Sequence, residues 1–171
     1  MNKYLKFKSI KTKSLTSAKI KKILLLKKQI YNFSLISQKK WFYENINLND
    51  INNLLIYDKK IIGYTALRIK KGILNKKQIN LLIFDTFLVD KTYRKKGFGA
   101  ELMKFNNHII KKKKLGSLLI CEKSMIKFYK KFNWFNFNKN KIKFLNHDMN
   151  KKNVMLNNFR ANNIKNFIIN L

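Results

Sequence analysis

A glycine-bearing turn that follows a long apolar run is the segment of this sequence with the clearest chemistry. Residues 81–89 are apolar except for Asp85 and Thr86 and predict a strand. A polar stretch follows, and Gly97 and Gly99 then open a segment in which apolar residues recur at helical spacing. The first N–H groups of a helix have no intrahelical partner and carry the positive end of the helix dipole. This strand–turn–helix pattern therefore predicts a binding site for an anion such as phosphate.

The residues of the turn itself suit a phosphate ligand. Gly97 and Gly99 lack a Cβ, so phosphate oxygens can approach the backbone at these positions. Lys95 and Lys96 add positive charge at the rim of the turn. Two other phosphate-binding fingerprints are absent, because the sequence contains neither Gly-x-Gly-x-x-Gly with a downstream acidic residue nor Gly-Lys-Ser/Thr.

The string from Arg94 to Ala100, Arg-Lys-Lys-Gly-Phe-Gly-Ala, resembles the acetyl-CoA signature of the GNAT superfamily of N-acetyltransferases, Arg-x-x-Gly-x-Gly/Ala. A second motif follows in the family's order. The apolar run Leu118–Cys121 and the segment Phe128–Phe135 are similar to the family's strand and its Phe-Tyr-x-x-x-Gly-Phe helix end. The resemblance covers about Leu54–Phe137, roughly half of the chain. Two motifs in the correct order and spacing are more specific than either alone.

The sequence departs from the family pattern outside the phosphate turn. Asn133 stands where a glycine usually follows the short helix, and asparagine tolerates the left-handed conformation best among the other residues. Glu122 and Met125 stand where the family usually has asparagine and alanine. These two positions put the wall of the pantetheine site in question, but not the phosphate turn.

The resemblance implies acetyl-CoA as the acetyl donor, with its pyrophosphate on the turn and its pantetheine arm against the end of the preceding strand. The residues that it implies for cofactor binding are Phe87, Leu88, Val89, Arg94, Lys95, Lys96, Gly97, Phe98, Gly99 and Ala100. A backbone N–H near Phe87 or Leu88 would face the acetyl carbonyl and stabilise the oxyanion. An incoming primary amine then attacks the thioester directly, without a covalent enzyme intermediate.

The resemblance also implies a general acid for the departing thiolate. The incoming ammonium has to lose a proton, so a general base is needed as well. Tyr129 matches the family tyrosine that protonates or hydrogen-bonds the departing thiolate, and a phenol and a thiol are similar in acidity. Some relatives use a glutamate as the base, at a position that falls near Ile83 here. Asp85 lies two residues further on, on the same face of the strand, and is the best candidate base. Glu122 and a relay through ordered water remain open as alternatives.

The acceptor is expected to be the primary amine of a small molecule. The segment Leu119–Glu122 before Tyr129 is similar to aminoglycoside 2′-N-acetyltransferases, and Trp41–Ile46 is similar to bacterial acetyltransferases that act on nucleotide-linked amino sugars. Amino sugars, nucleotide-linked amino sugars and aminoglycoside-like amines therefore all stay open as acceptors. Five aromatic residues are expected to line the acceptor pocket, namely Trp41, Phe42, Tyr43, Tyr57 and Tyr64. For Trp41 and Phe42, packing in the core is the alternative.

Strand and helix patterns on either side of the turn predict a mixed α/β domain that spans residues 1–171. By resemblance this is the GNAT fold, with about seven strands splayed around the cofactor cleft and four helices. Strands are expected at 4–10, 54–57, 61–69, 78–89, 118–121, 134–145 and 153–159. Helices are expected from caps at Ser14–Ser17 to about Ile30, at 38–45, from Gly97 to a stop signal at Gly116, and at 124–132.

The chain has 39 basic and eight acidic residues among its 171, and a formal net charge of +31. Nearly all of the basic residues are lysine, whereas bidentate recognition of phosphate or guanine favours arginine. Lysine, asparagine, isoleucine, phenylalanine and tyrosine are abundant and proline is absent, which is typical of an AT-rich genome. We therefore expect a basic surface that attracts anionic substrates, and not a dedicated nucleic-acid site. The alternatives are a nucleic-acid-binding protein and a GNAT-fold protein that binds acyl-CoA without catalysis.

Composition also limits disulfides, metals and membranes. Cys121 is the only cysteine, which excludes an internal disulfide, and it is expected to be a small buried hydrophobic residue. With only His108 and His147 beside it, both expected at the surface, no metal site is predicted. No apolar run has the length of a membrane span or of the core of a secretory signal, so the expected location is the cytoplasm. A monomer and a homodimer both stay open.

Overall fold

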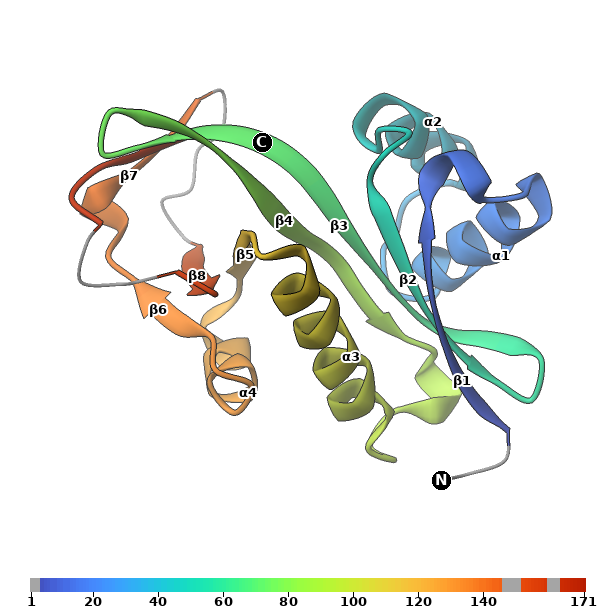
Figure 1. The fold of residues 1–171 in the computed structure, drawn as a ribbon. Coiled ribbons are helices and arrows are strands. Elements are labelled where there is room, and N and C mark those ends of the chain that lie inside the picture. Colours follow the sequence, from blue (N-terminus) through green and yellow to red (C-terminus); the bar gives the residue numbers. More distant parts are fainter. Residues whose placement is uncertain (1–3, 146–151, 160–163) are drawn as a thin grey trace. The chain divides into compact units, whose positions relative to one another are not determined.

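The computed structural model describes residues 4–145, 152–159 and 164–171. The chain groups into two compact units. Unit 1 comprises Met1–Arg68 and Thr86–Asn106, and unit 2 comprises Ile69–Asp85 and Asn107–Leu171. Three elements run from one unit into the other, namely strand β3 (Lys60–Leu74), strand β4 (Lys77–Val89) and helix α3 (Phe98–Lys113) (Figure 1).

The strands form one mixed sheet in the order β1-β2-β3-β4-β5-β8-β6, and β9 pairs with both β3 and β7. The remaining strands are β1 (Leu5–Lys11), β2 (Ile51–Tyr57), β5 (Gly116–Cys121), β6 (Phe135–Phe137), β7 (Ile142–Leu145), β8 (Asn153–Asn157) and β9 (Phe167–Asn170). The predicted mixed α/β class with four α-helices is confirmed. The described residues contain nine strands where about seven were expected.

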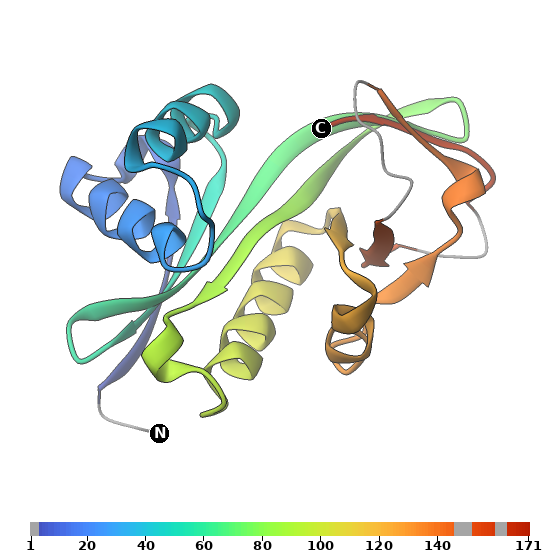
Figure 2. The ribbon, with the colours of Figure 1, turned by 180° about the vertical axis from the view of Figure 1, so that it is seen from behind.

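In unit 1, helices cover both faces of the sheet. Helices α1 (Ser17–Lys28) and α2 (Leu35–Asn45) lie on one face, and the first part of α3 lies on the other (Figure 1 and Figure 2). Two adjacent residues of β2 show this division, since Leu54 packs with α1 and α2 whereas Leu55 packs with Leu102 of α3. The alternation follows from the two-residue period of a strand.

Hydroxyl side chains cap the first two helices. Thr16 accepts a hydrogen bond from the N–H three residues on at 3.4 Å, which places the cap of α1 within the predicted range. Ser34 caps α2 in the same way at 3.0 Å. Helix α2 therefore begins at Leu35 and not at Gln38, the predicted start, because its hydroxyl cap lies at Ser34.

The hairpin between β2 and β3 turns on two residues with left-handed backbone. Asp58 and Lys59 have φ angles of 46° and 62°, and Tyr57 pairs with Lys60 on either side of them. Positive φ at both central residues is the conformation of a two-residue type I′ loop, whose twist matches that of the flanking strands. The predicted three-residue turn is thus one residue too long, since Lys60 already belongs to β3.

Unit 2 is built around β5, which pairs in parallel with β4 and antiparallel with β8. Strand β6 pairs with β8, and β9 pairs with β7 and with β3. The predicted strand at 134–145 is divided into β6 and β7 by a 3₁₀ turn at Lys139–Lys141, and no sequence pattern predicts β9. The predicted helix at 124–132 is shorter, with a 3₁₀ turn at Lys123–Met125 followed by α4 (Ile126–Lys130).

Gly116 has a different role from the predicted helix stop. Helix α3 ends at Lys113, and the next residue, Lys114, has a φ of 54°, the left-handed conformation common at helix C-termini. Gly116 is already the first residue of β5, and the ring of Phe159 occupies the position that a Cβ would take. The missing side chain at Gly116 therefore serves packing within unit 2.

A buried polar network fixes α3 to the strands of unit 1. Asn106 is fully buried, and its Nδ2 donates to Thr65 Oγ1 at 3.2 Å and to the Leu102 carbonyl at 2.7 Å. Its Oδ1 accepts a hydrogen bond from Asn53 Nδ2 at 2.8 Å. Because a buried polar group left without a partner costs about 1–3 kcal/mol, this network holds the helix in one position.

Replacing Asn106 with leucine removes a partner from both Asn53 and Thr65 while keeping the site buried. We expect Asn106→Leu to lower the free energy of unfolding by about 2–4 kcal/mol, measured by urea denaturation. Lys104→Ala removes only an exposed 2.8 Å pair with Glu101 and is the control, with an expected loss of less than about 1 kcal/mol. A loss in Asn106→Leu no larger than that of the control would show that the network does not hold α3.

Candidate functional site

The predicted anion-binding turn lies wholly in unit 1 and is anchored by Asp90, which is buried directly after β4. Asp90 Oδ1 accepts hydrogen bonds from the N–H and the hydroxyl of Thr92 at 3.0 and 2.8 Å. Its Oδ2 accepts from Gln29 Nε2 at 3.3 Å and lies 3.3 Å from Lys60 Nζ. Burial by itself raises the pKa of Asp90, but these hydrogen bonds, led by those from Thr92, outweigh it and hold the pKa below its usual value. Asp90 is therefore an ionised anchor for the turn.

Arg94 and three aromatic rings complete the framework of the turn. Arg94 Nε donates to the Val89 carbonyl at 3.2 Å, so this side chain reaches back to the end of β4. The ring centroids of Tyr57, Tyr93 and Phe98 lie 5.5 to 5.8 Å from one another. Tilted and edge-on ring pairs of this kind stabilise by about 0.5–1.5 kcal/mol each. Tyr57, which was expected to line the acceptor pocket, belongs to this cluster.

The N–H groups that open α3 have no protein partner. The first hydrogen bond across the helix start runs from the Glu101 N–H to the Gly97 carbonyl at 3.2 Å. Within the part of the chain that the structure describes, no group accepts a hydrogen bond from the N–H of Phe98, Gly99 or Ala100. Apart from Gly97 itself and its two neighbours in the chain, no atom of the described residues lies within 4 Å of the position that a Cβ would take at Gly97, where φ is +82°. The start of α3 therefore presents three N–H donors beside an open glycine.

The turn is also basic and exposed. Arg94, Lys95 and Lys96 are all exposed, and Lys95 has a left-handed φ of 59°. Lys96 Nζ lies 5.8 Å from the centroid of the Tyr93 ring. Unpaired N–H donors at a helix N-terminus, with cations beside them, suit a phosphate or pyrophosphate group.

Strand β4 carries a strained residue that the sequence does not reveal. Thr86 has a φ of 54°, which is unusual for a β-branched residue. Strain of this kind concentrates at functional sites and at irregularities in strands. After Thr86, Leu88 packs with α1 and α2, whereas Phe87 and Val89 pack with the cluster that includes α3. Threonine favours extended strands, so no local signal marks this position.

The ladder between β4 and β5 is short. It pairs Leu81–Ile83 with Gly116–Leu118, although β4 continues to Val89 and β5 to Cys121. Residues 87–89 therefore lie outside this ladder. They are the residues that the resemblance implies for the pantetheine arm.

Tyr129 lies in unit 2, where it is buried on α4. Its ring centroid lies 6.2, 5.4 and 6.4 Å from those of Phe84, Phe128 and Trp134. Asn133, in the turn after α4, has a φ of 62°, so it takes the left-handed conformation that the sequence predicts for this glycine position. The second motif is thus formed locally as expected, and the catalytic role of Tyr129 stays a prediction.

The two candidate bases differ in their surroundings. Asp85 is half-buried on the part of β4 that belongs to unit 2. Glu122 is exposed and forms an ion pair with Lys152. Their roles in catalysis also stay predictions.

Two of the residues expected at the acceptor pocket are core residues of unit 1. Phe42 and Tyr64 are fully buried, and the Tyr64 hydroxyl donates to Asn52 Oδ1 at 2.8 Å. Core packing was the alternative for Phe42. Tyr64 was expected to line the acceptor pocket, and its burial in the core corrects that expectation. Trp41 is half-buried, with Lys27 Nζ 4.0 Å from its ring centroid.

The remaining polar residues offer little further chemistry. Cys121 is buried, as predicted, and burial, followed by the charge of Glu122, raises the pKa of its thiol. His108 is exposed, as predicted, and His147 lies outside the described residues. Among the described residues, no three His, Cys, Asp or Glu side chains gather in a way that suits a metal ion. No helix in the same part of the chain combines the length and the apolar character needed to cross a membrane.

Comparison with known proteins agrees with this geometry. The family model described as "Acetyltransferase (GNAT) domain" matches residues 50–134, a segment that contains both the turn and Tyr129. No curated protein matches the chain in sequence.

Solved structures share the fold over most of the chain. The GNAT family N-acetyltransferase YhbS from Escherichia coli, in complex with CoA, has a TM-score of 0.68 at 10% identity, over 98% of this chain and 89% of that one. An acyl-CoA N-acyltransferase from Pseudomonas aeruginosa has a TM-score of 0.66 at 12% identity, over 89% and 98%. Arabidopsis thaliana Naa50, in complex with the bisubstrate analogue CoA-Ac-MVNAL, has a TM-score of 0.62 at 18% identity, over 91% and 99%. At these identities the likeness shows the fold alone.

The family match and the shared fold support each other. The match covers the part of the chain that runs from β2 to the end of the second motif, and the fold extends over nearly all of the rest. This protein belongs to the GNAT superfamily of acetyltransferases.

Proposed function

We propose that this protein transfers the acetyl group of acetyl-CoA to a primary amine of a small molecule, within a single domain that spans residues 1–171. Membership of the GNAT superfamily supports the reaction class, acyl transfer from an acyl-CoA to an amine. The observation that carries the proposal is the open start of α3, where the N–H groups of Phe98, Gly99 and Ala100 have no acceptor among the described residues. A pyrophosphate has the charge and the oxygens that match these donors.

The residues of the turn fit the pyrophosphate of coenzyme A. The open space at Gly97 leaves room for an oxygen close to the backbone. Arg94 uses Nε to hold the Val89 carbonyl, which leaves its terminal nitrogens available for a phosphate. Lys95 and Lys96 are exposed and add charge from solvent. The turn thus combines directed N–H donors with exposed cations.

The backbone of Phe87, Leu88 and Val89 is proposed to hold the pantetheine arm. These residues lie outside the ladder between β4 and β5, and the backbone N–H and C=O groups at the edge of a ladder are where an extended, amide-containing ligand can bind. The left-handed residue Thr86 turns the backbone directly before them. The N–H of Phe87 or Leu88 is proposed to bind the acetyl carbonyl oxygen.

Two side chains are proposed to move protons. Acetyl-CoA, when bound, supplies an activated acetyl thioester for direct attack by the amine. Tyr129 donates a hydrogen bond or a proton to the sulfur as it leaves. Asp85 accepts the proton of the incoming ammonium, directly or through ordered water. Glu122 is the alternative base, although its ion pair with Lys152 competes with that role.

The proposed acceptors are amino sugars, nucleotide-linked amino sugars and aminoglycoside-like amines. A net charge of +31 raises the local concentration of anions, so an acceptor that carries phosphate has the advantage in reaching the site. A nucleotide-linked amino sugar combines such phosphates with a primary amine. We expect the reaction to take place in the cytoplasm.

Gly99→Glu tests the phosphate turn. Acetyl-CoA at a hundredfold excess over its Kd should stabilise the wild-type protein by about 2.7 kcal/mol, which a thermal-shift measurement detects as a rise of roughly 5–10 °C in Tm. The carboxylate of Gly99→Glu would stand where a phosphate binds, so this rise should vanish. The nearest atoms to a Cβ at Gly99, on Phe87 and Val89, are 4.0 Å away, so the variant should keep its fold.

His108→Glu is the matched control for that experiment. It adds the same charge at an exposed position of the same helix and should keep the full rise in Tm. A full rise in Gly99→Glu would remove the turn from the cofactor site. No rise in the wild-type protein, together with DNA binding that falls steeply with salt, would replace the enzyme by a nucleic-acid-binding protein.

Tyr129→Phe tests the acid while keeping the ring. We expect kcat for free-thiol release, measured across a panel of amino sugars and nucleotide-linked amino sugars, to fall about 10²–10⁴-fold. The rise in Tm with acetyl-CoA should persist, because the hydroxyl does not hold the pyrophosphate. Tyr4→Phe removes an exposed phenol near the N-terminus and should leave kcat unchanged. An unchanged kcat in Tyr129→Phe would assign the acid to another group.

A further inference from the structure

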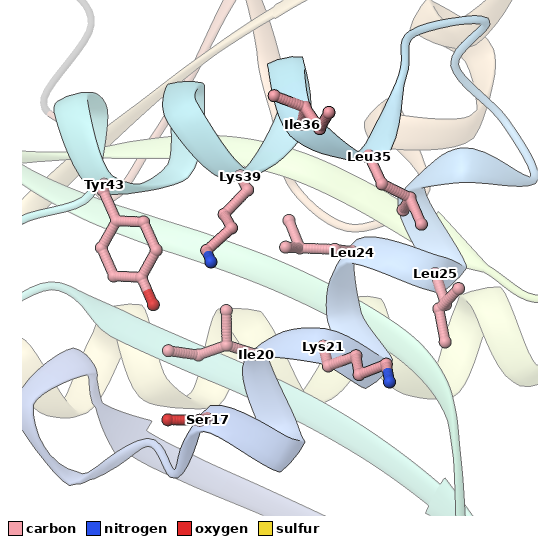
Figure 3. Close-up of a pocket in the computed structure, with 9 residues that line it drawn as sticks. All are labelled: Ser17, Ile20, Lys21, Leu24, Leu25, Leu35, Ile36, Lys39 and Tyr43. Carbon is pink, nitrogen blue, oxygen red and sulfur yellow. The ribbon is translucent and has the colours of Figure 1, made fainter.

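Helices α1 and α2 leave an open groove of about 390 Å³ between them, within unit 1. Ile20 and Leu24 of α1 and Leu35 of α2 form apolar walls. Lys21 and Lys39 also line the groove, and Figure 3 shows the Lys39 side chain extending from α2 toward α1. The groove is therefore apolar with ammonium groups beside it.

Large apolar side chains project into solvent around this groove. Ile36 is 81% exposed and Leu25 is 45% exposed, and Phe33 and Tyr43 are more than half exposed. Leu25, Ile36 and Tyr43 line the groove (Figure 3), and Phe33 lies directly before the Ser34 cap of α2. Apolar residues that are exposed together mark an interaction surface.

The same segment is strongly basic. Residues 17–45 contain seven lysines and one acidic residue, Glu44, which lies 3.9 Å from Lys40. Lys27 is buried against Trp41 and does not contribute to the surface charge. The exposed lysines are Lys21, Lys22, Lys28, Lys39 and Lys40. A partner for this surface has to be anionic and apolar at once.

An anionic lipid bilayer meets both conditions. Its phosphate groups attract lysines, and the boundary of its acyl chains takes up apolar side chains. A second copy of this chain would bring like charges together, and a nucleic acid offers negative charge without an apolar layer. We propose that the α1–α2 face, defined as Leu25, Phe33, Ile36, Tyr43 and the five exposed lysines, binds the surface of an anionic bilayer.

The contact is peripheral and independent of the proposed acetyl transfer. The lysines pair with headgroup phosphates, and the four apolar side chains enter the boundary between headgroups and acyl chains. The α1–α2 face contains no residue of the phosphate turn and does not include Tyr129. Tyr43, which is expected from the sequence at the acceptor pocket, belongs to the face, and none of the variants that test the face changes it. The two proposals can therefore fail separately.

Co-sedimentation with vesicles of phosphatidylglycerol and phosphatidylcholine, compared with phosphatidylcholine alone, tests the proposal. The net charge of +31 attracts the whole chain to any anionic vesicle at low salt. The decisive measurement is therefore made in 0.5 M NaCl, where the Debye length is about 4 Å. The wild-type protein should still bind there, because inserted apolar side chains are not screened. Leu25→Ser/Ile36→Ser should lose at least about tenfold in affinity.

Ile73→Ser/Leu145→Ser is the matched control. It removes the same two side-chain types from β3 and β7, where they are 44% and 39% exposed, and should bind vesicles like the wild-type protein.

A second pair of variants tests the charges in 0.15 M NaCl. Lys21→Gln/Lys39→Gln should lose about fivefold in affinity per lysine, the effect of a lysine close to an anionic surface. Lys112→Gln/Lys113→Gln removes two charges from the exposed end of α3 and should lose much less.

Three results would overturn the proposal. The first is no binding to phosphatidylglycerol vesicles, and the second is an equal loss in both serine variants. The third is binding of an acidic amphipathic model peptide that Leu25→Ser/Ile36→Ser abolishes while vesicle binding is unchanged, since the face would then dock a protein segment. Thermal unfolding, monitored by circular dichroism, verifies that each variant is folded. If a serine variant is not folded, the comparison between the two lysine double variants tests the proposal instead.

Discussion

The first N–H groups of α3 have to remain unpaired and yet be held in place, and the rest of the site depends on this constraint. Such groups are tolerated at a helix N-terminus because solvent or a ligand reaches them. The structure around them must therefore be rigid without capping the helix. Asp90 meets this need before the helix begins, since its carboxylate accepts hydrogen bonds from Thr92, Gln29 and Lys60. Because the carboxylate of Asp90 binds these other donors, it does not cap α3. The first N–H groups of α3 therefore stay available for an anionic ligand.

The direction of these donors is decided further along the helix. An N–H at a helix start points along the helix axis, so any contact that orients the axis also orients the donor. Asn106, about two turns after Gly99, is tied to Asn53 and Thr65 by hydrogen bonds. Apolar packing of Leu102 alone would tolerate small rotations, whereas hydrogen bonds between buried side chains are directional and are costly to break. The buried network around Asn106 thus fixes the direction in which the exposed N–H groups at the start of α3 point.

Charge acts on this protein at two levels. Eight acidic residues stand against 39 basic ones, so a general positive potential attracts nucleotides and anionic membranes alike. Attraction of this kind does not distinguish one anion from another. Discrimination requires geometry, and the two surfaces differ in it. The turn before α3 presents directed N–H donors, which we propose bind a compact pyrophosphate, whereas the α1–α2 face presents exposed apolar side chains that only a ligand with an apolar layer can use.

The order of strand, turn and helix, the basic character of the turn and the left-handed residue at Asn133 follow from the sequence by itself, because each depends on residues a few positions apart. Tertiary structure alone decided the positive φ of Thr86, the ring of Phe159 at Gly116 and the return of β9 to β3. These features depend on contacts between segments that are distant in the sequence, and the local propensities of the residues do not predict such contacts. The site divides in the same way. The sequence identified which N–H groups could bind an anion, but only tertiary structure decided that those of residues 98–100 stay unpaired, because capping depends on which distant groups pack against a helix start.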